Sequence, residues 1–116
     1  MLNQKKLNQI LPLTEATFYI LLALATPQHG YAVMQDVEQM SNQSVQLGPG
    51  TLYGAFNKLE EIKLIDLADE LDRRKIYTIT AAGRQILLAQ AKRFEVMLKN
   101  VEARTDLLTG SRHTDE

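Results

Sequence analysis

Three consecutive cations, Arg73, Arg74 and Lys75, form the longest run of basic side chains in the 116-residue chain. They stand between two short β-prone segments, 64–68 and 75–79, which predict a hairpin with a charged loop at 69–74. Guanidinium and ammonium groups bind DNA phosphates, so this run predicts contact with a nucleic-acid backbone. A solvated hairpin edge, at which Lys prevents pairing with another strand, is the alternative.

A second group of candidate residues lies on one expected helix that is opened by Gly48 and Pro49. Apolar residues at helical spacing define its buried stripe: Leu52, Phe56, Leu59 and Ile62. Its other face is a mixed polar surface that also includes Glu61, and the candidate DNA-binding residues on it are Thr51, Tyr53, Gly54, Asn57 and Lys58. Hydroxyls and an amine suit phosphate oxygens, and the Asn57 amide can pair with adenine. Gly54 allows a close approach to the DNA backbone.

The sequence offers little for catalysis or metal binding. It has no cysteine and only two histidines, so it lacks the clusters of ligands that form zinc sites. It also offers no nucleophile beside a general base. No glycine-rich phosphate loop follows a predicted strand. We therefore expect a protein that is not an enzyme and has no metal or cofactor. His29 is expected to make local hydrogen bonds in a turn.

Composition is that of an ordinary globular protein, with 45% hydrophobic and 23% charged residues. The polar N-terminus precedes no signal-peptide core, and the richest apolar run, 18–25, is about half as long as a membrane helix. We therefore expect a cytoplasmic protein without membrane contact. Because the net charge is −1, any DNA site must be locally basic.

Several helices are expected to position the candidate residues. A short helix over about 2–11 should end at Pro12, and Thr14 should cap a buried helix that continues to Ala25. Residues 26–30 have the composition of a turn, and a further helix is expected over 31–40. Tyr31 and Tyr77 are expected to be half-buried.

The last helix is the longest, about 81–107, and Thr80 is expected to cap it. At 1.5 Å per residue it would span about 40 Å, which is more than a core of this size covers. Apolar residues continue along it at spacings of four and three: Leu87, Ala91, Phe94, Leu98 and Val101. This stripe predicts a coiled-coil-like homodimer. Phe94, Met97 and Leu98 could line an effector pocket in the seam, with a plain interface core as the alternative.

After the short N-terminal helix, three helices, a hairpin and a long helix follow the order of a winged helix-turn-helix protein, a mainly α (α+β) fold. Three segments, HGYAVMQDVE from His29, GPGTLYGAFNKLEEIKLI from Gly48 and RRKIYTITAAGRQIL from Arg73, resemble the PadR-like family of transcriptional regulators. The resemblance covers about residues 12–90. It implies a DNA-binding domain over 1–79 and a dimerisation helix over 80–108, followed by a tail, 109–116, that we expect to be disordered.

The resemblance also implies a function. A homodimer would bind an inverted-repeat operator in duplex DNA as a repressor. Thr51, Tyr53 and Lys58 of the helix opened by Gly48 and Pro49 would contact the DNA. The hairpin would be the wing, and its three basic residues, the wing cations, would contact the DNA beside them: Arg73, Arg74 and Lys75. A small hydrophobic or aromatic effector would bind near the dimer interface.

A winged-helix dimer that binds protein in place of DNA is the other hypothesis. The near-neutral charge and the acidic hairpin residues favour it: Asp66, Asp69, Glu70 and Asp72.

Overall fold

Thr14 and Thr80 each begin a helix in the computed structural model, which describes residues 1–110. The Oγ1 atom of Thr14 accepts a hydrogen bond from the Thr17 N–H (3.1 Å), and that of Thr80 accepts one from the Gly83 N–H (3.0 Å). Both caps satisfy amide groups that have no partner within the helix. The two predicted N-caps are confirmed.

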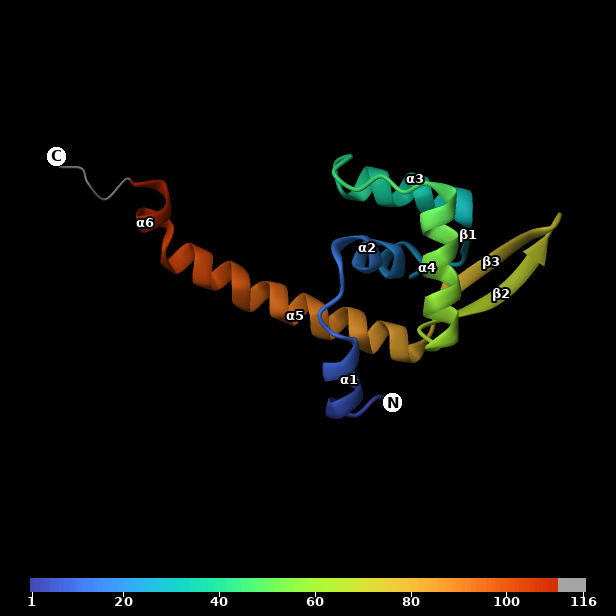
Figure 1. The fold of residues 1–116 in the computed structure, drawn as a ribbon, viewed down its shortest axis with the longest axis horizontal. Helices are drawn as coiled ribbons and strands as arrows, with labels where there is room; N and C mark the ends of the chain where they lie inside the picture. The colour runs from blue at the N-terminus through green and yellow to red at the C-terminus, as the bar shows by residue number, and fades with distance from the viewer. Residues whose placement is uncertain (111–116) are drawn as a thin grey trace.

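Four helices form the head of the molecule together with a small sheet (Figure 1). Their bounds are α1 Gln4–Ile10, α2 Glu15–Ala23, α3 Gly30–Met40 and α4 Pro49–Glu61. The side of α4 that carries Leu52, Phe56 and Leu59 is buried, as predicted, whereas Ile62 just beyond it is 36% exposed. Tyr31 is 61% exposed, so the prediction of a half-buried side chain is wrong.

The sheet has three antiparallel strands in the order β1-β3-β2, with β1 Gln28–His29, β2 Ile65–Leu71 and β3 Arg74–Ile79. Strand β1 lies where a turn was predicted. A strand of two residues is too short to show an alternation of apolar and polar side chains in the sequence. Its pairing partners, Ile76 and Tyr77, lie far along the chain. The strand therefore exists because β3 offers it an edge.

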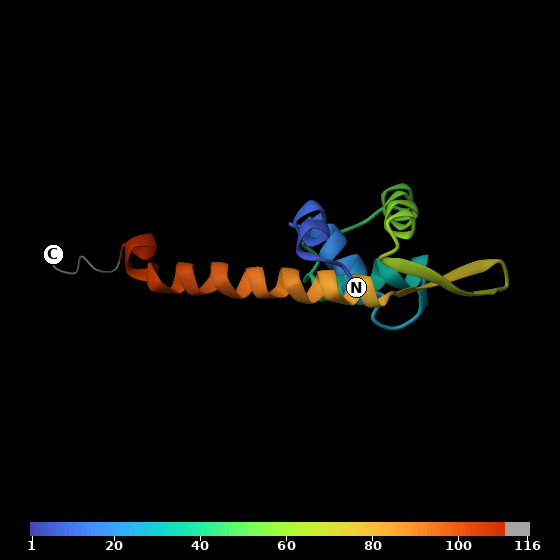
Figure 2. The same ribbon diagram turned by 90° about the horizontal axis from the view of Figure 1, so that it is seen from below.

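The hairpin of β2 and β3 is longer than predicted and projects from the head (Figure 2). Its turn contains only Asp72 and Arg73, both at positive φ (51° and 67°), between the paired residues Leu71 and Arg74. Two positive φ values characterise the type I′ turn, whose twist matches that of a two-stranded ribbon. The charged segment predicted as a loop is therefore mostly strand.

The long helix α5, Ala81–Ala103, extends away from the head (Figures 1 and 2) and has 23 residues, or about 35 Å. It ends four residues before the predicted end, and a short helix α6, Thr105–Thr109, follows. At the break, the Arg104 N–H and the Thr105 hydroxyl both donate to the Val101 carbonyl (3.0 and 3.3 Å). Such local bonds compete with the helical ladder. The predicted tail lies outside the described residues from 111 onward, while Thr109 is helical.

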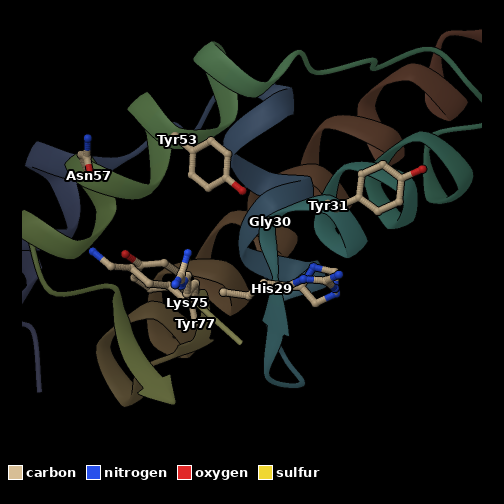
Figure 3. A pocket seen from close by; sticks show the side chains of 9 residues that line it. His29, Gly30, Tyr31, Tyr53, Asn57, Lys75 and Tyr77 are labelled. Atoms are coloured by element: carbon tan, nitrogen blue, oxygen red, sulfur yellow. The ribbon is translucent and has the colours of Figure 1, made fainter. Parts of the chain in front are cut away.

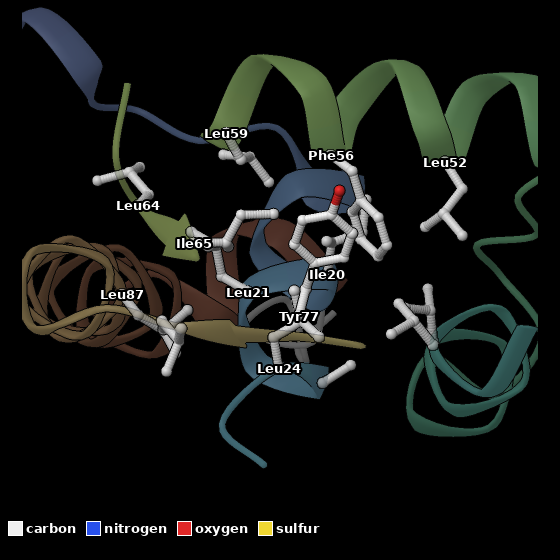
Figure 4. Close-up of a cluster of buried hydrophobic side chains, with 14 of the residues drawn as sticks. Ile20, Leu21, Leu24, Leu52, Phe56, Leu59, Leu64, Ile65, Tyr77 and Leu87 are labelled. Carbon is white, nitrogen blue, oxygen red and sulfur yellow. The ribbon is translucent and has the colours of Figure 1, made fainter. Parts of the chain in front are cut away.

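The core fills the space between α2, α3, α4, the hairpin base and the first half of α5 (Figure 4). Phe56 lies at its centre, with its ring 4.9 Å from that of the inward-facing Tyr77. At Gly83, a Cβ atom would overlap the Leu64 carbonyl oxygen and stand 2.6 Å from Ile79. Helix α5 therefore begins in direct contact with the hairpin.

Candidate nucleic-acid interface

The outer face of α4 presents the five residues predicted for it. Thr51, Tyr53, Gly54, Asn57 and Lys58 are all exposed, on the side opposite the buried stripe. Within the described part of the chain, nothing lies within 4 Å of the place where a Cβ atom would stand at Gly54. The middle of this helix is therefore open to a close approach by another molecule.

Tyr53 is held in place by its neighbours, although its side chain is 47% exposed. Its ring meets that of Phe56 edge-on, with centroids 5.8 Å apart. On the other side it lies directly over Gly30, where a Cβ atom would overlap the Tyr53 hydroxyl and stand 2.7 Å from Cζ. The hydroxyl points toward the start of α3 (Figure 3).

An open cleft of about 510 Å³ lies between the start of α3, helix α4 and the hairpin (Figure 3). It is lined by His29, Gly30, Tyr31, Tyr53, Asn57, Arg73, Arg74, Lys75 and Tyr77. The cleft thus joins two of the α4 residues to all three wing cations. Among residues 1–110, no acidic residue lines it.

The hairpin carries cations and carboxylates in close succession. Arg73, Arg74 and Lys75 are exposed, and Glu70 is the cross-strand partner of Lys75. Asp69 Oδ1 accepts a hydrogen bond from the Glu70 N–H (2.7 Å), so that carboxylate is turned toward its own backbone. The positive side chains reach the cleft, whereas the acidic residues do not line it.

His29 belongs to this site, and sequence reasoning placed it only in a turn. Its Nδ1 atom accepts a hydrogen bond from the Ala32 N–H (3.4 Å) and caps α3, while Nε2 lies 3.3 Å from Arg74 Nη1. A polar residue just before an apolar helical pattern was the available signal for the cap. The pairing of β1 with β3, which brings His29 to Arg74, left no such signal.

Tyr77 closes the cleft from inside. Its side chain is 5% exposed and faces inward, so it is more deeply buried than the half-buried position that was predicted. Burial, and after it the neighbouring Glu60 carboxylate, raise the pKa of the Tyr77 phenol above its ordinary value of 10.0. The phenol is therefore a neutral structural group.

The predicted dimer stripe on α5 is mostly exposed. Phe94 (39%), Leu98 (58%) and Val101 (50%) are open to solvent, and Ala91 is half-buried. Leu87 differs, because it is buried in the core of its own chain. The assignment of Leu87 to the seam is therefore corrected: the exposed stripe begins beyond it.

A second cleft, of about 530 Å³, lies where the segment after α1 crosses α5, and its lining residues are Pro12, Leu13, Gln90, Arg93, Phe94, Val96 and Met97. Phe94 and Met97 of the predicted effector pocket line it, whereas Leu98 does not. The Phe94 ring also meets Phe18 edge-on, with centroids 5.1 Å apart.

The family model of PadR-like transcriptional regulators matches residues 18–89, which include most of α2, all of α3, α4 and the hairpin, and the start of α5. The chain belongs to the PadR-like family. Its members are transcriptional regulators and not enzymes, and the sequence-based predictions of family and fold are confirmed.

Individual relatives agree with this membership. A 37.1 kDa protein of transposon Tn4556 from Streptomyces fradiae is 41% identical over 78 residues, which are 66% of this chain and 22% of that protein. The transcriptional regulator YqjI of Escherichia coli K12 is 26% identical over 76 residues, 66% of this chain and 37% of that protein. The chain therefore spans well under two thirds of the length of these relatives.

Among solved structures, a PadR family regulator from Clostridium difficile has the same fold, with a TM-score of 0.64 at 22% identity. The alignment covers 78% of this chain and 97% of that one. Within residues 1–110, no helix is long and apolar enough to cross a membrane.

Proposed function

We propose that the protein is a cytoplasmic transcriptional repressor that binds an inverted-repeat operator in duplex DNA as a homodimer. The observation that carries this proposal is the cleft in which Tyr53 and Asn57 of α4 meet Arg73, Arg74 and Lys75 of the hairpin. A helix for the major groove and a cationic hairpin for the backbone on one face are the parts that winged-helix readers use.

Within this proposal the exposed residues divide by chemistry. Thr51, Tyr53 and Lys58 bind phosphate oxygens through hydroxyl and ammonium groups, and Asn57 pairs with adenine. The open space at Gly54 lets α4 enter the groove. The wing cations bind phosphates beside the groove. Their positive charge makes the interface locally basic, although the whole chain has a net charge of −1.

A salt series on duplex DNA tests the proposal. Binding of random duplex should weaken steeply as salt rises, because each protein–phosphate contact releases counterions. Lys58→Ala should weaken operator and random DNA alike, whereas Asn57→Ala should weaken the operator by about 1–3 kcal/mol and random DNA little. If parent and variants bind no DNA at any salt, a protein-interaction module, which the acidic hairpin residues favour, becomes the better assignment.

Dimerisation through α5 is part of the proposal, since an exposed apolar stripe of this length calls for a partner helix. Leu98→Asp should convert a dimer into a monomer or an aggregate in light scattering. Leu88→Asp is the matched control: Leu88 is at least as exposed (68%, against 58% for Leu98) but is turned about 100° from the stripe. A parent that stays monomeric at tens of micromolar would contradict this part.

An aromatic or hydrophobic effector is the last part of the proposal, and the second cleft, beside Phe94 and Met97, supports it. Flat aromatic compounds should raise the melting temperature of the parent, and Phe94→Ala should abolish that rise. Stabilisation that survives Phe94→Ala would place the compound elsewhere.

A further inference from the structure

The register of the sheet places a histidine beside an arginine on one face. His29 of β1 is paired with Ile76 of β3, and Arg74 lies two residues before Ile76 on the same face. Diagonal neighbours of this kind are within reach of long side chains. His29 Nε2 and Arg74 Nη1 accordingly lie 3.3 Å apart.

The hydrogen-bonding capacity of these groups does not match. Both ring nitrogens of His29 face donors: Nδ1 faces the Ala32 N–H and Nε2 faces the guanidinium of Arg74. A neutral imidazole accepts at one nitrogen only, an imidazolium at neither, and a guanidinium has no acceptor. In every protonation state, therefore, at least one of the two contacts lacks an acceptor.

An anionic oxygen between the two side chains removes this mismatch. With Nδ1 accepting from Ala32, the Nε2–H can donate to such an oxygen, and Arg74 can donate to it as well. The cleft at this point is open and also contains the side chains of Tyr53 and Lys75, and none of its lining residues supplies a carboxylate. An anionic oxygen of a bound molecule can supply the acceptor that neither His29 nor Arg74 provides.

We infer that His29 and Arg74 together bind one backbone phosphate of duplex DNA, with an oxygen of that phosphate held between His29 Nε2 and the Arg74 guanidinium. This inference rests on the proposed function and extends it. The start of α3 becomes a third DNA contact, beside α4 and the hairpin. His29 then has two roles, capping α3 with one nitrogen and binding DNA with the other.

A substitution can separate the two roles. In His29→Asn, the amide oxygen takes the place of Nδ1 and preserves the cap, because Asn is among the best N-cap residues. Nothing replaces Nε2. We expect this variant to melt like the parent and to bind operator and random duplex about tenfold more weakly, since one hydrogen bond to a charged group is lost. His29→Asp also preserves the cap, and its negative charge should weaken binding further.

Salt dependence distinguishes His29 from its cationic neighbour. Arg74→Ala should lower the slope of log affinity against log salt by about 0.9, whereas His29→Asn should leave the slope unchanged, because a neutral group releases no counterion. The two substitutions should be non-additive, since both remove bonds to one oxygen. Lys58→Ala, on a residue that does not line the cleft, should add its effect independently.

DNA affinity that is unchanged in His29→Asn, while Lys58→Ala and Arg74→Ala weaken binding, would overturn the inference and leave the proposed function intact. A parent that binds no DNA would overturn both. Inorganic phosphate provides the remaining arm: if it stabilises the parent but not His29→Asn, while the two bind DNA equally, the site holds a free anion and the inference fails.

Discussion

The hydroxyl of Tyr53 occupies the space that a Cβ atom at Gly30 would need. Helix α3 therefore determines where Tyr53 of α4 presents its hydroxyl to the cleft. Gly30→Ala should displace the tyrosine ring and weaken DNA binding, and it should lower the free energy of unfolding by about 1 kcal/mol at most, because the overlapping atoms all belong to the end of a half-exposed side chain. Urea denaturation and a DNA titration measure the two effects.

Gly54→Ala is the matched control, because a Cβ atom there meets nothing within 4 Å. It should raise stability by up to about 1 kcal/mol through helix propensity. Gly30→Ala should cost less stability in a Tyr53→Ala background than in the parent, because the ring that the new Cβ atom displaces is then absent. If the cost of Gly30→Ala is the same with and without the tyrosine ring, the contact does not explain it.

Two glutamines of α5 fasten the N-terminal segment, with different expected energies. Gln90 is buried (1% exposed), and its Oε1 accepts a hydrogen bond from the Leu13 N–H (2.6 Å). Gln90→Leu should cost about 1–3 kcal/mol, because it leaves that amide without a partner. The half-buried Gln85 bonds the backbone N–H and carbonyl of Leu2, both at 2.9 Å.

Gln85→Ala should therefore change the melting temperature little and speed hydrogen exchange at residues 2–7, since a terminal segment opens locally. Equal losses of global stability in the two variants would contradict this distinction.

Tyr77 makes stability depend on alkaline pH. Because its pKa is raised on folding, the folded state holds the phenolic proton more tightly than the unfolded state. Its contribution is fully present below about pH 10 and is lost as the pH rises through the folded pKa. Tyr77→Phe should remove this pH-dependent contribution. Above about pH 10, the free energy of unfolding of the parent should therefore fall relative to that of the variant. A difference that is independent of pH up to 11 would contradict it.

Local signals in the sequence were sufficient for most elements. Thr14 and Thr80 were recognisable as caps because each is a hydroxyl residue directly before a helical pattern. The buried face of α4 followed from the spacing of Leu52, Phe56 and Leu59, and its exposed face followed with it.

Features that depend on distant partners were not recognisable. Strand β1 exists because β3 pairs with it, and the approach of His29 to Arg74 is a result of that pairing. The heptad spacing on α5 continued through Leu87 without showing that the head of the same chain already covers that residue. Periodicity identifies a face but not the surface that buries it.

The turn of the hairpin offers the sharpest test of the wing. Arg73 has a φ of 67°, a region in which side chains with a Cβ atom cost about 1–2 kcal/mol and glycine costs nothing. Arg73→Gly should therefore raise the stability of the hairpin by up to about 1 kcal/mol and yet weaken DNA binding, with a salt slope lower by about 0.9.

Asp72→Gly relieves the same kind of strain at a φ of 51° but removes a negative charge, so it should strengthen binding. The two glycine variants change the backbone alike and the charge oppositely. If both change DNA affinity in the same direction, the flexibility of the turn, and not phosphate contact by Arg73, controls binding.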